Sequence, residues 1–166
     1  VLYLKEDTTV LIDPHGSDID GDELTWVSSD PANGVVTWIG SRILYRPNLN
    51  FFGTDTFTVT ASDGGTESNV ATIILYVIEQ NDAPKAFAQT VSTNEDSAVA
   101  FECRASDVED DALTWNATAP AHGVLTGDGP NFTYTPNAKF SGTDAFWITV
   151  NDGELDSTPA RIVIVV

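Results

Sequence analysis

The chain has 166 residues, and 25 acidic residues against 7 basic ones give it a formal net charge of −18. This charge argues against binding to nucleic acids or anionic membranes, because both would repel such a surface. With one cysteine, Cys103, no apolar run of about 18 residues and no signal-like start, we expect neither an internal disulfide nor direct membrane insertion.

Apolar and polar residues alternate along much of the chain, which is the period of β-strands rather than of helices. Phe57, Val59 and Ala61, for example, alternate with threonines. In chain order, the first half is predicted to form seven strands, near 2–5, 9–12, 23–28, 34–39, 42–46, 55–61 and 70–78. Short strands separated by turn residues at this spacing predict an all-β sandwich.

The second half repeats the first with a constant offset. Residues 17–26 (SDIDGDELTW) return as 106–115 (SDVEDDALTW), and 51–55 (FFGTD) returns as 140–144 (FSGTD), so that both pairs differ by 89 positions. A tandem repeat of this length is one small domain used twice. We therefore expect the same seven strands 89 residues further on.

The segment 81–84 (NDAP) lies between the two copies. Pro84 fixes its own φ and biases Ala83 toward extended backbone, and the segment has no Gly or Ser to make it flexible. We predict domain 1 at 1–80, a short linker at 81–84 and domain 2 at 85–166.

The acids that recur at the offset lie beside predicted turns. They are Glu6/Glu95, Asp7/Asp96, Asp18/Asp107, Asp20/Glu109, Asp22/Asp111, Asp55/Asp144 and Asp63/Asp152. Three carboxylates within residues 18–22 repel one another unless a cation lies among them. Ca²⁺ suits such a loop because it prefers several oxygen ligands. Zn²⁺ and copper do not fit, since the two histidines are isolated and unmatched.

Two alternatives for these acids stay open at this point. The charge by itself is compatible with a merely soluble or halophilic surface. Asp63 and Asp55 also suit turns for backbone reasons, and Glu6 could be a solvated strand edge. An EF-hand is excluded, because Gly21 precedes the last acid of the loop and no helix flanks it.

The motifs together resemble the cadherin-like tandem repeats of large bacterial surface and secreted proteins. The pattern runs from Glu6-Asp7 through DIDGDELT (18–25), YRPN (45–48), FFGTD (51–55) and Asp63-Gly64 to NDAP (81–84). The resemblance covers nearly the whole chain. It implies two tandem Ig-like, Greek-key β-sandwich domains in an extended end-to-end arrangement.

The resemblance also implies calcium between consecutive domains, with ligands from one domain end, the linker and the next domain. Carried over by position, the junction ligands are Glu6, Asp55, Asn81, Asp82, Asp107, Glu109 and Asp152. Asp18, Asp20 and Asp63 would form half of a site shared with a preceding repeat, and Glu95 and Asp144 half of a site shared with a following one. The second copy departs from the first, because Glu109-Asp110 replaces Asp20-Gly21.

The resulting prediction is a calcium-dependent extracellular adhesion module that partners neighbouring repeats of its own chain. A second copy of the protein and polysaccharide are further predicted partners. The alternative prediction is a carbohydrate-binding accessory domain of a secreted polysaccharide-degrading enzyme, for which Trp38, Tyr76 and Trp147 are predicted to point outward. Catalysis is not expected, because the chain has no nucleophile elbow, no phosphate-binding glycine loop and no base near Cys103.

Overall fold

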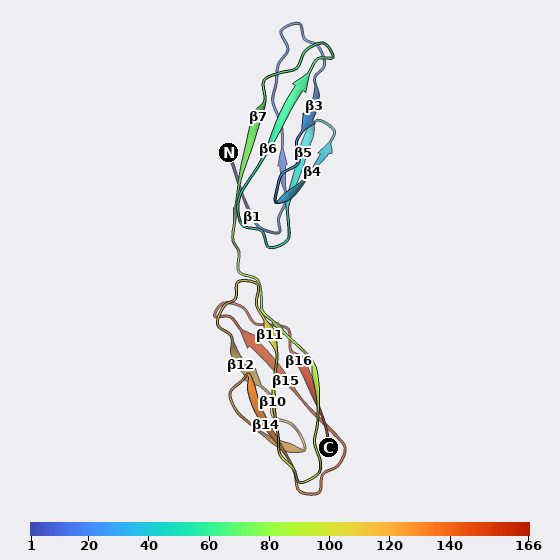
Figure 1. Ribbon diagram of the computed structural model, residues 1–166, viewed down its shortest axis with the longest axis vertical. Coiled ribbons are helices and arrows are strands. Elements are labelled where there is room, and N and C mark those ends of the chain that lie inside the picture. The colour runs from blue at the N-terminus through green and yellow to red at the C-terminus, as the bar shows by residue number, and fades with distance from the viewer. The chain divides into compact units, whose positions relative to one another are not determined.

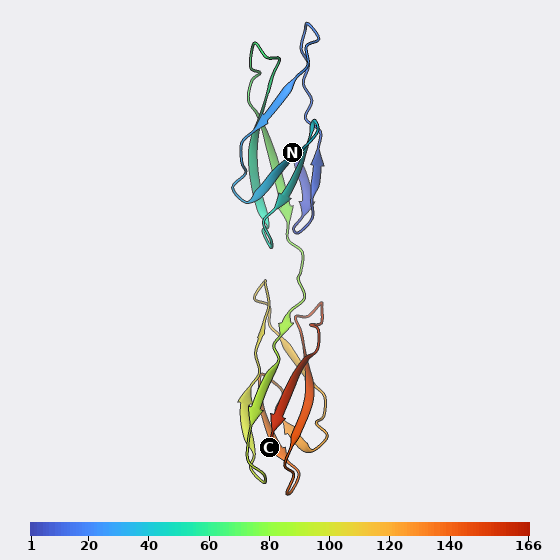
Figure 2. The ribbon, with the colours of Figure 1, turned by 90° about the vertical axis from the view of Figure 1, so that its right-hand side faces the viewer.

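The computed structural model describes residues 1–166, and these divide into two units, Val1–Gln80 and Asn81–Val166. All regular elements are strands. Figures 1 and 2 show the same arrangement inside each unit, with strands along the long axis of the unit and loops at its two ends. The predicted all-β fold of two tandem sandwiches is confirmed. Residues 81–84, predicted as a separate linker, belong to the second unit.

Unit 1 consists of two facing sheets. Its strands are β1 (Leu2–Lys5), β2 (Val10–Ile12), β3 (Thr25–Ser28), β4 (Gly34–Ile39), β5 (Arg42–Pro47), β6 (Gly53–Ser62) and β7 (Ala71–Ile78). One sheet has the order β1-β7-β6-β3 and the other β2-β5-β4. β1 pairs with β7 in parallel, and the other pairs are antiparallel. All seven strands lie within a few residues of their predicted positions.

Unit 2 has the same two sheets, β9-β16-β15-β12 and β10-β14-β13, and one added pair, β8-β11. Its strands are β8 (Lys85–Ala86), β9 (Gln89–Ser92), β10 (Val99–Glu102), β11 (Ala105–Ser106), β12 (Thr114–Ala117), β13 (Gly123–Thr126), β14 (Asn131–Pro136), β15 (Thr143–Asn151) and β16 (Ala160–Val165). The two-residue strands β8 and β11 were not predicted, because so short a segment carries no alternating pattern.

The pairing register repeats together with the sequence. Val10 lies opposite Tyr45 in unit 1, and Val99 lies opposite Tyr134 in unit 2. The pair Thr25–Ser62 likewise returns as Thr114–Asn151. Since a one-residue slip would turn every inward side chain outward, the shared register places residues that differ by 89 on the same face of the two sandwiches.

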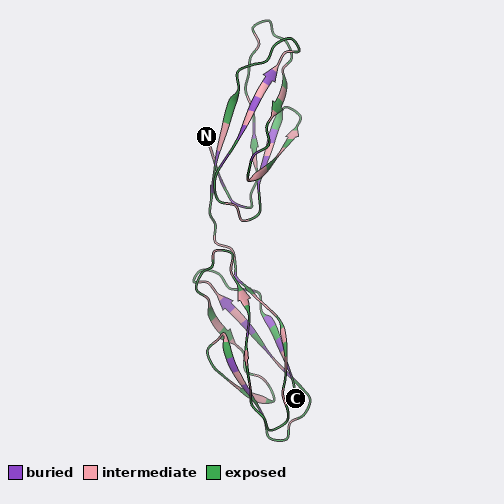
Figure 3. Ribbon diagram, in the orientation of Figure 1, coloured by how far each residue is buried: buried purple, intermediate pink, exposed green.

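Each unit has its own apolar core between its sheets, seen as the buried stripes of Figure 3. Tyr45 and Tyr134 are fully buried, as are Phe57 and Phe146. The tyrosine rings lie over glycines, because a Cβ built on Gly34 or Gly123 would come within 2.6 or 2.4 Å of the ring. A side chain at either glycine would therefore displace the tyrosine.

Three expectations about single side chains have different outcomes. Cys103 is buried in the core as predicted, at 2% exposure. Tyr76 and Trp147 are exposed at 39% and 48%, also as predicted. The outward placement of Trp38 is wrong, because its half-buried ring packs against the core of unit 1 and its Nε1 donates a hydrogen bond to Ser28 Oγ. No helix in the structure is long and apolar enough to cross a membrane.

Candidate metal centre

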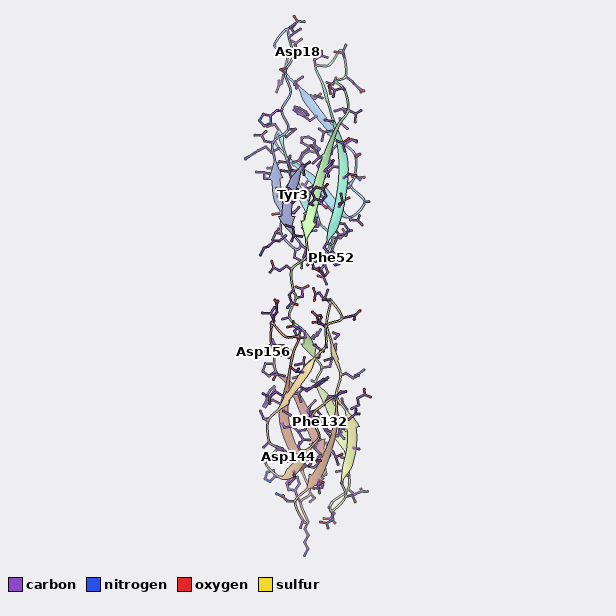
Figure 4. All side chains as sticks on the ribbon, turned by 90° about the vertical axis from the view of Figure 1, so that its left-hand side faces the viewer. Tyr3, Asp18, Phe52, Phe132, Asp144 and Asp156 are labelled. Carbon is purple, nitrogen blue, oxygen red and sulfur yellow. The ribbon has the colours of Figure 1, made fainter.

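The acidic loop between the second and third predicted strands of each domain is built on one aspartate. In unit 1, Asp18 Oδ1 accepts hydrogen bonds from the amides of Asp20 and Asp22, at 2.8 and 3.2 Å. Asp18 lies in the loops at one end of unit 1 and Phe52 at the opposite end (Figure 4). In unit 2, Asp107 Oδ1 accepts from Glu109 and Asp111 in the same way, at 3.2 and 3.1 Å. Carboxylates favour such turns because they satisfy amides that no strand partner reaches.

A second recurring aspartate holds the turn after the longest strand. Asp63 Oδ1 accepts from the amides of Gly65 and Thr66, and Asp152 Oδ1 accepts from Glu154 and Leu155. The hydrogen bonds lower the pKa of Asp63 to about 2, and the bond from the Thr66 amide contributes most. The amide of Leu155 and the side chain of Asn81 lower the pKa of Asp152. Both aspartates therefore carry a negative charge at neutral pH.

Unit 2 adds contacts from its first residues to this shared pattern. Asn81 Nδ2 donates a hydrogen bond to Asp152 Oδ2 at 2.9 Å. The backbone of Asp82 lies beside the Glu109 carboxylate. Burial, with further contributions from the charges of Asp107 and Asp82, raises the pKa of Glu109. At one end of unit 2 the structure thus forms two groups of predicted ligands, which the peptide bond between Asn81 and Asp82 joins: Asn81 with Asp152, and Asp82 and Asp107 with Glu109.

Two oxygens in this cluster are buried and have no hydrogen-bond partner, namely Asp107 Oδ2 and Glu109 Oε2. A buried polar atom left unpaired costs about 1–3 kcal/mol, and more when it is charged. Such atoms are rare in native proteins and require a physical explanation. A cation bound to these oxygens would supply the missing interaction, and oxygen atoms are the ligands that Ca²⁺ prefers.

The corresponding acids of unit 1 are arranged differently. Asp18 and Asp63 line one cavity of about 380 Å³ together with Trp26 and His15. Asp20, the counterpart of Glu109, is exposed and does not line that cavity. None of the three has a buried oxygen without a partner. The predicted half-site of Asp18, Asp20 and Asp63 therefore brings two of its three residues to one cavity.

Glu6 has a role within unit 1. It is 4% exposed, and its Oε1 accepts a hydrogen bond from the amide of Gln80 at 2.5 Å, while its own amide donates to the carbonyl of Ile78. The side chain therefore holds the last residues of unit 1 next to the end of β1. Its participation in calcium binding stays a prediction.

Asp55 serves the interior of unit 1. Its oxygens accept from the Tyr45 hydroxyl at 2.8 Å and from the amides of Ala32, Asn33 and Thr56. Asp144 repeats this arrangement with the Tyr134 hydroxyl at 2.9 Å and the amides of Ala121, His122 and Ala145. These bonds account for both oxygens and for the recurrence of the residue, so we leave Asp55 out of the calcium site proposed below.

The structure has no group of three or more His, Cys, Asp or Glu side chains arranged to hold a metal ion. Sequence reasoning did identify the acids of the unit 2 cluster, because they recur beside turns. It missed the Tyr–Asp pairs, although the joint recurrence of Tyr45 with Asp55 and of Tyr134 with Asp144 was a usable signal.

The repeat, the two sandwiches and their matching registers agree with a comparison against protein families. The family model described as "Bacterial Ig domain" matches residues 1–75 and again residues 81–165. The chain belongs to this family. Two bacterial Ig domains in tandem account for the repeat and for the all-β fold.

Similarity to individual proteins is more distant. The Arabidopsis thaliana protein GAMETE EXPRESSED 2 is 33% identical over 85 residues, a match that takes in 50% of this chain and 9% of that protein. Human protocadherin-24 EC1-2 is 16% identical with a TM-score of 0.49, covering 99% of this chain and 91% of that one. An endo-fucoidan hydrolase of glycoside hydrolase family 107 is 21% identical with a TM-score of 0.44, covering 99% of this chain and 27% of the hydrolase.

Proposed function

We propose that this pair of bacterial Ig domains is an extracellular adhesion-type structural module whose second domain binds Ca²⁺. The observation that carries the proposal is the pair of buried, unpartnered oxygens, Asp107 Oδ2 and Glu109 Oε2. They lie in a cluster with two more carboxylates and one carboxamide, in a chain with a net charge of −18. A divalent cation would lower the repulsion among these charges.

The free oxygens of the cluster define the proposed ligands. Asp107 uses Oδ1 for the turn, which leaves Oδ2 to a cation. Asn81 donates to Asp152 through Nδ2, which leaves its carbonyl oxygen as an acceptor. Together with Glu109 and Asp82 these oxygens approach the six to eight that Ca²⁺ takes, with water filling the remainder. Mg²⁺ is less suitable because it demands stricter octahedral geometry.

The proposed consequence is mechanical. Asn81 and Asp82 are the first residues of unit 2, and an ion that binds them together with the loop of Asp107 restricts the segment through which the chain enters that domain. An adhesion protein built from such domains would gain stiffness wherever calcium is present. Extracellular calcium sites bind with dissociation constants of about 10⁻⁴ to 10⁻³ M.

The experiment is thermal and chemical unfolding of the 166-residue chain in 10 mM CaCl₂ and in chelator. At these affinities the ion stabilises the folded state by about 1.4–2.7 kcal/mol, which raises the melting temperature of a domain of this size by several degrees. Asp107→Asn should abolish most of this response. Asp18→Asn, the matched change in unit 1, should leave it intact.

Two results would contradict the proposal. One is an unfolding curve that calcium does not move, and the other is an equal loss of response in the two variants. Glu6→Gln, measured in the same way, determines whether the predicted ligand from unit 1 contributes. Small-angle scattering with and without calcium then reports whether ion binding restricts the chain.

A further inference from the structure

The strands of one sheet of unit 2 carry no acidic side chain on their outer face, and Asp156 reaches its edge from a loop through a hydrogen bond from Asn151. Only three of the 25 acids of the chain lie in strands, namely Asp55, Glu102 and Asp144, and Asp55 and Asp144 point into the cores. The sheet β9-β16-β15-β12 therefore presents threonine, serine, asparagine and small apolar residues to solvent, together with Arg161. A face whose strands carry no acid, on so acidic a chain, is a candidate interaction surface.

Trp147 lies in β15, one of the two central strands of this sheet, and differs from the other tryptophans. Trp26, Trp38 and Trp115 are half-buried and pack against the two cores. Trp147 is 48% exposed, packs against neither core and makes no hydrogen bond through its indole nitrogen. A large aromatic ring left in solvent is more informative than a scattered aliphatic residue, because its burial would gain more free energy.

The ring borders a shallow hollow of about 610 Å³, within the range of small-molecule sites. The other lining residues are Asn116, Thr118, Thr149 and Pro159, and none of them is charged. Thr118 fixes the floor, because its Oγ1 accepts from the Trp147 amide and its own amide donates to the Trp147 carbonyl, both at 2.9 Å.

Two polar side chains of the hollow are available to a ligand. Asn116 lies directly opposite Thr149 in the β12–β15 pair, and neither side chain hydrogen-bonds within the chain. Arg161 lies directly opposite Trp147 in the β15–β16 pair, on the same face. The hollow thus combines one flat apolar ring with a carboxamide, a hydroxyl and a nearby guanidinium.

Unit 1 carries different side chains at the equivalent place. The residues 89 positions earlier are Thr58 for Trp147, Val27 for Asn116 and Val70 for Pro159. Because the pairing registers are the same, this difference concerns side chains alone. The aromatic ring is an addition to a shared framework and is not required by it.

We propose that the Trp147 hollow binds a neutral polysaccharide chain. The apolar C–H face of a pyranose ring would stack on the indole, while ring hydroxyls hydrogen-bond to Asn116 and Thr149. Sugar hydroxyls are neutral donors and acceptors and match the uncharged lining. An anionic glycan would meet one cation but also the field of a chain of net charge −18.

The size of the hollow favours this occupant over a second copy of the chain. Stable protein interfaces bury about 800 Å² on each partner, whereas the hollow presents one aromatic ring and four small neighbours. A single sugar ring covers such an area. The hollow shares no residue with the acid cluster, so its occupancy does not depend on the calcium proposal.

The test is retention of the 166-residue chain on insoluble cellulose, xylan, mannan and chitin, followed by titration with the matching oligosaccharide. Trp147→Thr introduces the residue that unit 1 carries at this position, so the sheet keeps a favoured strand residue. It should weaken binding at least tenfold and leave the unfolding midpoint nearly unchanged. Tyr76→Val, which removes the other predicted outward aromatic, is the control and should bind like the parent.

The proposal requires that binding be equal in calcium and in chelator, which separates it from the calcium proposal. Failure of every polysaccharide to retain the chain would overturn it, as would retention that Trp147→Thr does not weaken. Sedimentation of the chain without ligand tests a second copy as the occupant. If the chain is a dimer and Trp147→Thr makes it a monomer, the hollow is a dimer interface and the polysaccharide proposal is wrong.

Discussion

The acidic ends of the two domains share a backbone plan and differ in how their charges are placed. Asp18 and Asp107 accept hydrogen bonds from amides at matching positions, and so do Asp63 and Asp152. Only unit 2 has buried oxygens without partners, because Glu109 replaces an exposed Asp20 and Asp82 lies beside it. The comparison shows that recurrence of an acid identifies the turn, while its surroundings determine whether its charge is left unpaired.

The interior of the two domains shows the opposite relation. The Tyr45–Asp55 and Tyr134–Asp144 pairs are alike in their partners, and their distances agree within 0.1 Å, at 2.8 and 2.9 Å. Each carboxylate accepts hydrogen bonds from three backbone amides. A buried charge is tolerated where hydrogen bonds satisfy it. The aspartate and the tyrosine therefore have the same structural role in both domains.

The largest predicted effect tests this equality. Asp144→Asn replaces a carboxylate that accepts four hydrogen bonds by a carboxamide whose NH₂ group would face amide donors. Since hydrogen bonds to a charged group contribute about 1.5–3 kcal/mol each and the loss leaves buried donors unpaired, we expect unit 2 to lose about 3 kcal/mol. Asp55→Asn should cost unit 1 the same amount in urea unfolding. A large difference between the two would show that the pairs are not equivalent.

The pH dependence of unfolding should report the same carboxylate. Burial alone would raise the pKa of Asp144, but the hydrogen bonds from His122, Tyr134 and Ala145 outweigh it and lower the pKa. The unfolded chain therefore takes up this proton at a higher pH than the folded one does. The contribution to stability is present above the ordinary aspartate pKa of about 3.9 and is lost as the pH falls through the lower folded value. Asp144→Asn should flatten this part of the stability profile.

A smaller effect is expected from the tyrosines. Tyr134→Phe removes one hydroxyl donor from Asp144 and keeps the ring that packs over Gly123. The carboxylate retains three amide donors, so the loss should be about 1 kcal/mol. Tyr45→Phe is the matched change in unit 1 and should cost a similar amount. Differential scanning calorimetry of both variants checks this, and a loss near that of Asp144→Asn would mean that the hydroxyl dominates the network.

The sequence was sufficient to predict two all-β sandwiches, most of their strands and the core, because these follow from local periodicity and from a repeat without gaps. Phe57 and Phe146 occupy apolar positions of alternating strands, and both side chains are buried as that alternation predicts. What it could not predict depends on neighbours that are distant in sequence. Trp38 lies opposite the buried Ile43 and on the same face of β4 as Val36, so the prediction that it points outward assigned the wrong face of this strand.

The site residues also divide into those that local sequence patterns could predict and those that depend on residues distant in sequence. Recurrence beside turns was enough to select Asp107 and Asp152, since turn geometry is local. Recurrence could not separate Asp55, whose partners Ala32 and Tyr45 lie 23 and 10 positions away. The contact between Asn81 and Asp152 spans 71 positions and has no counterpart in the repeat pattern. Only the family resemblance placed both residues at one site, and the folded chain shows the hydrogen bond that joins them.

The smallest predicted effect addresses the unpaired oxygen itself. Glu109→Gln removes a charge whose Oε2 is buried without a partner and which lies near two other carboxylates. In chelator we expect a gain in stability of under about 1 kcal/mol, because the variant removes the repulsion from Asp107 and Asp82 but still leaves a buried polar group without a partner. Asp20→Asn should change nothing, since Asp20 is exposed. In calcium the sign for Glu109→Gln should reverse, because the variant gives up a ligand, and urea midpoints in the two buffers measure both signs.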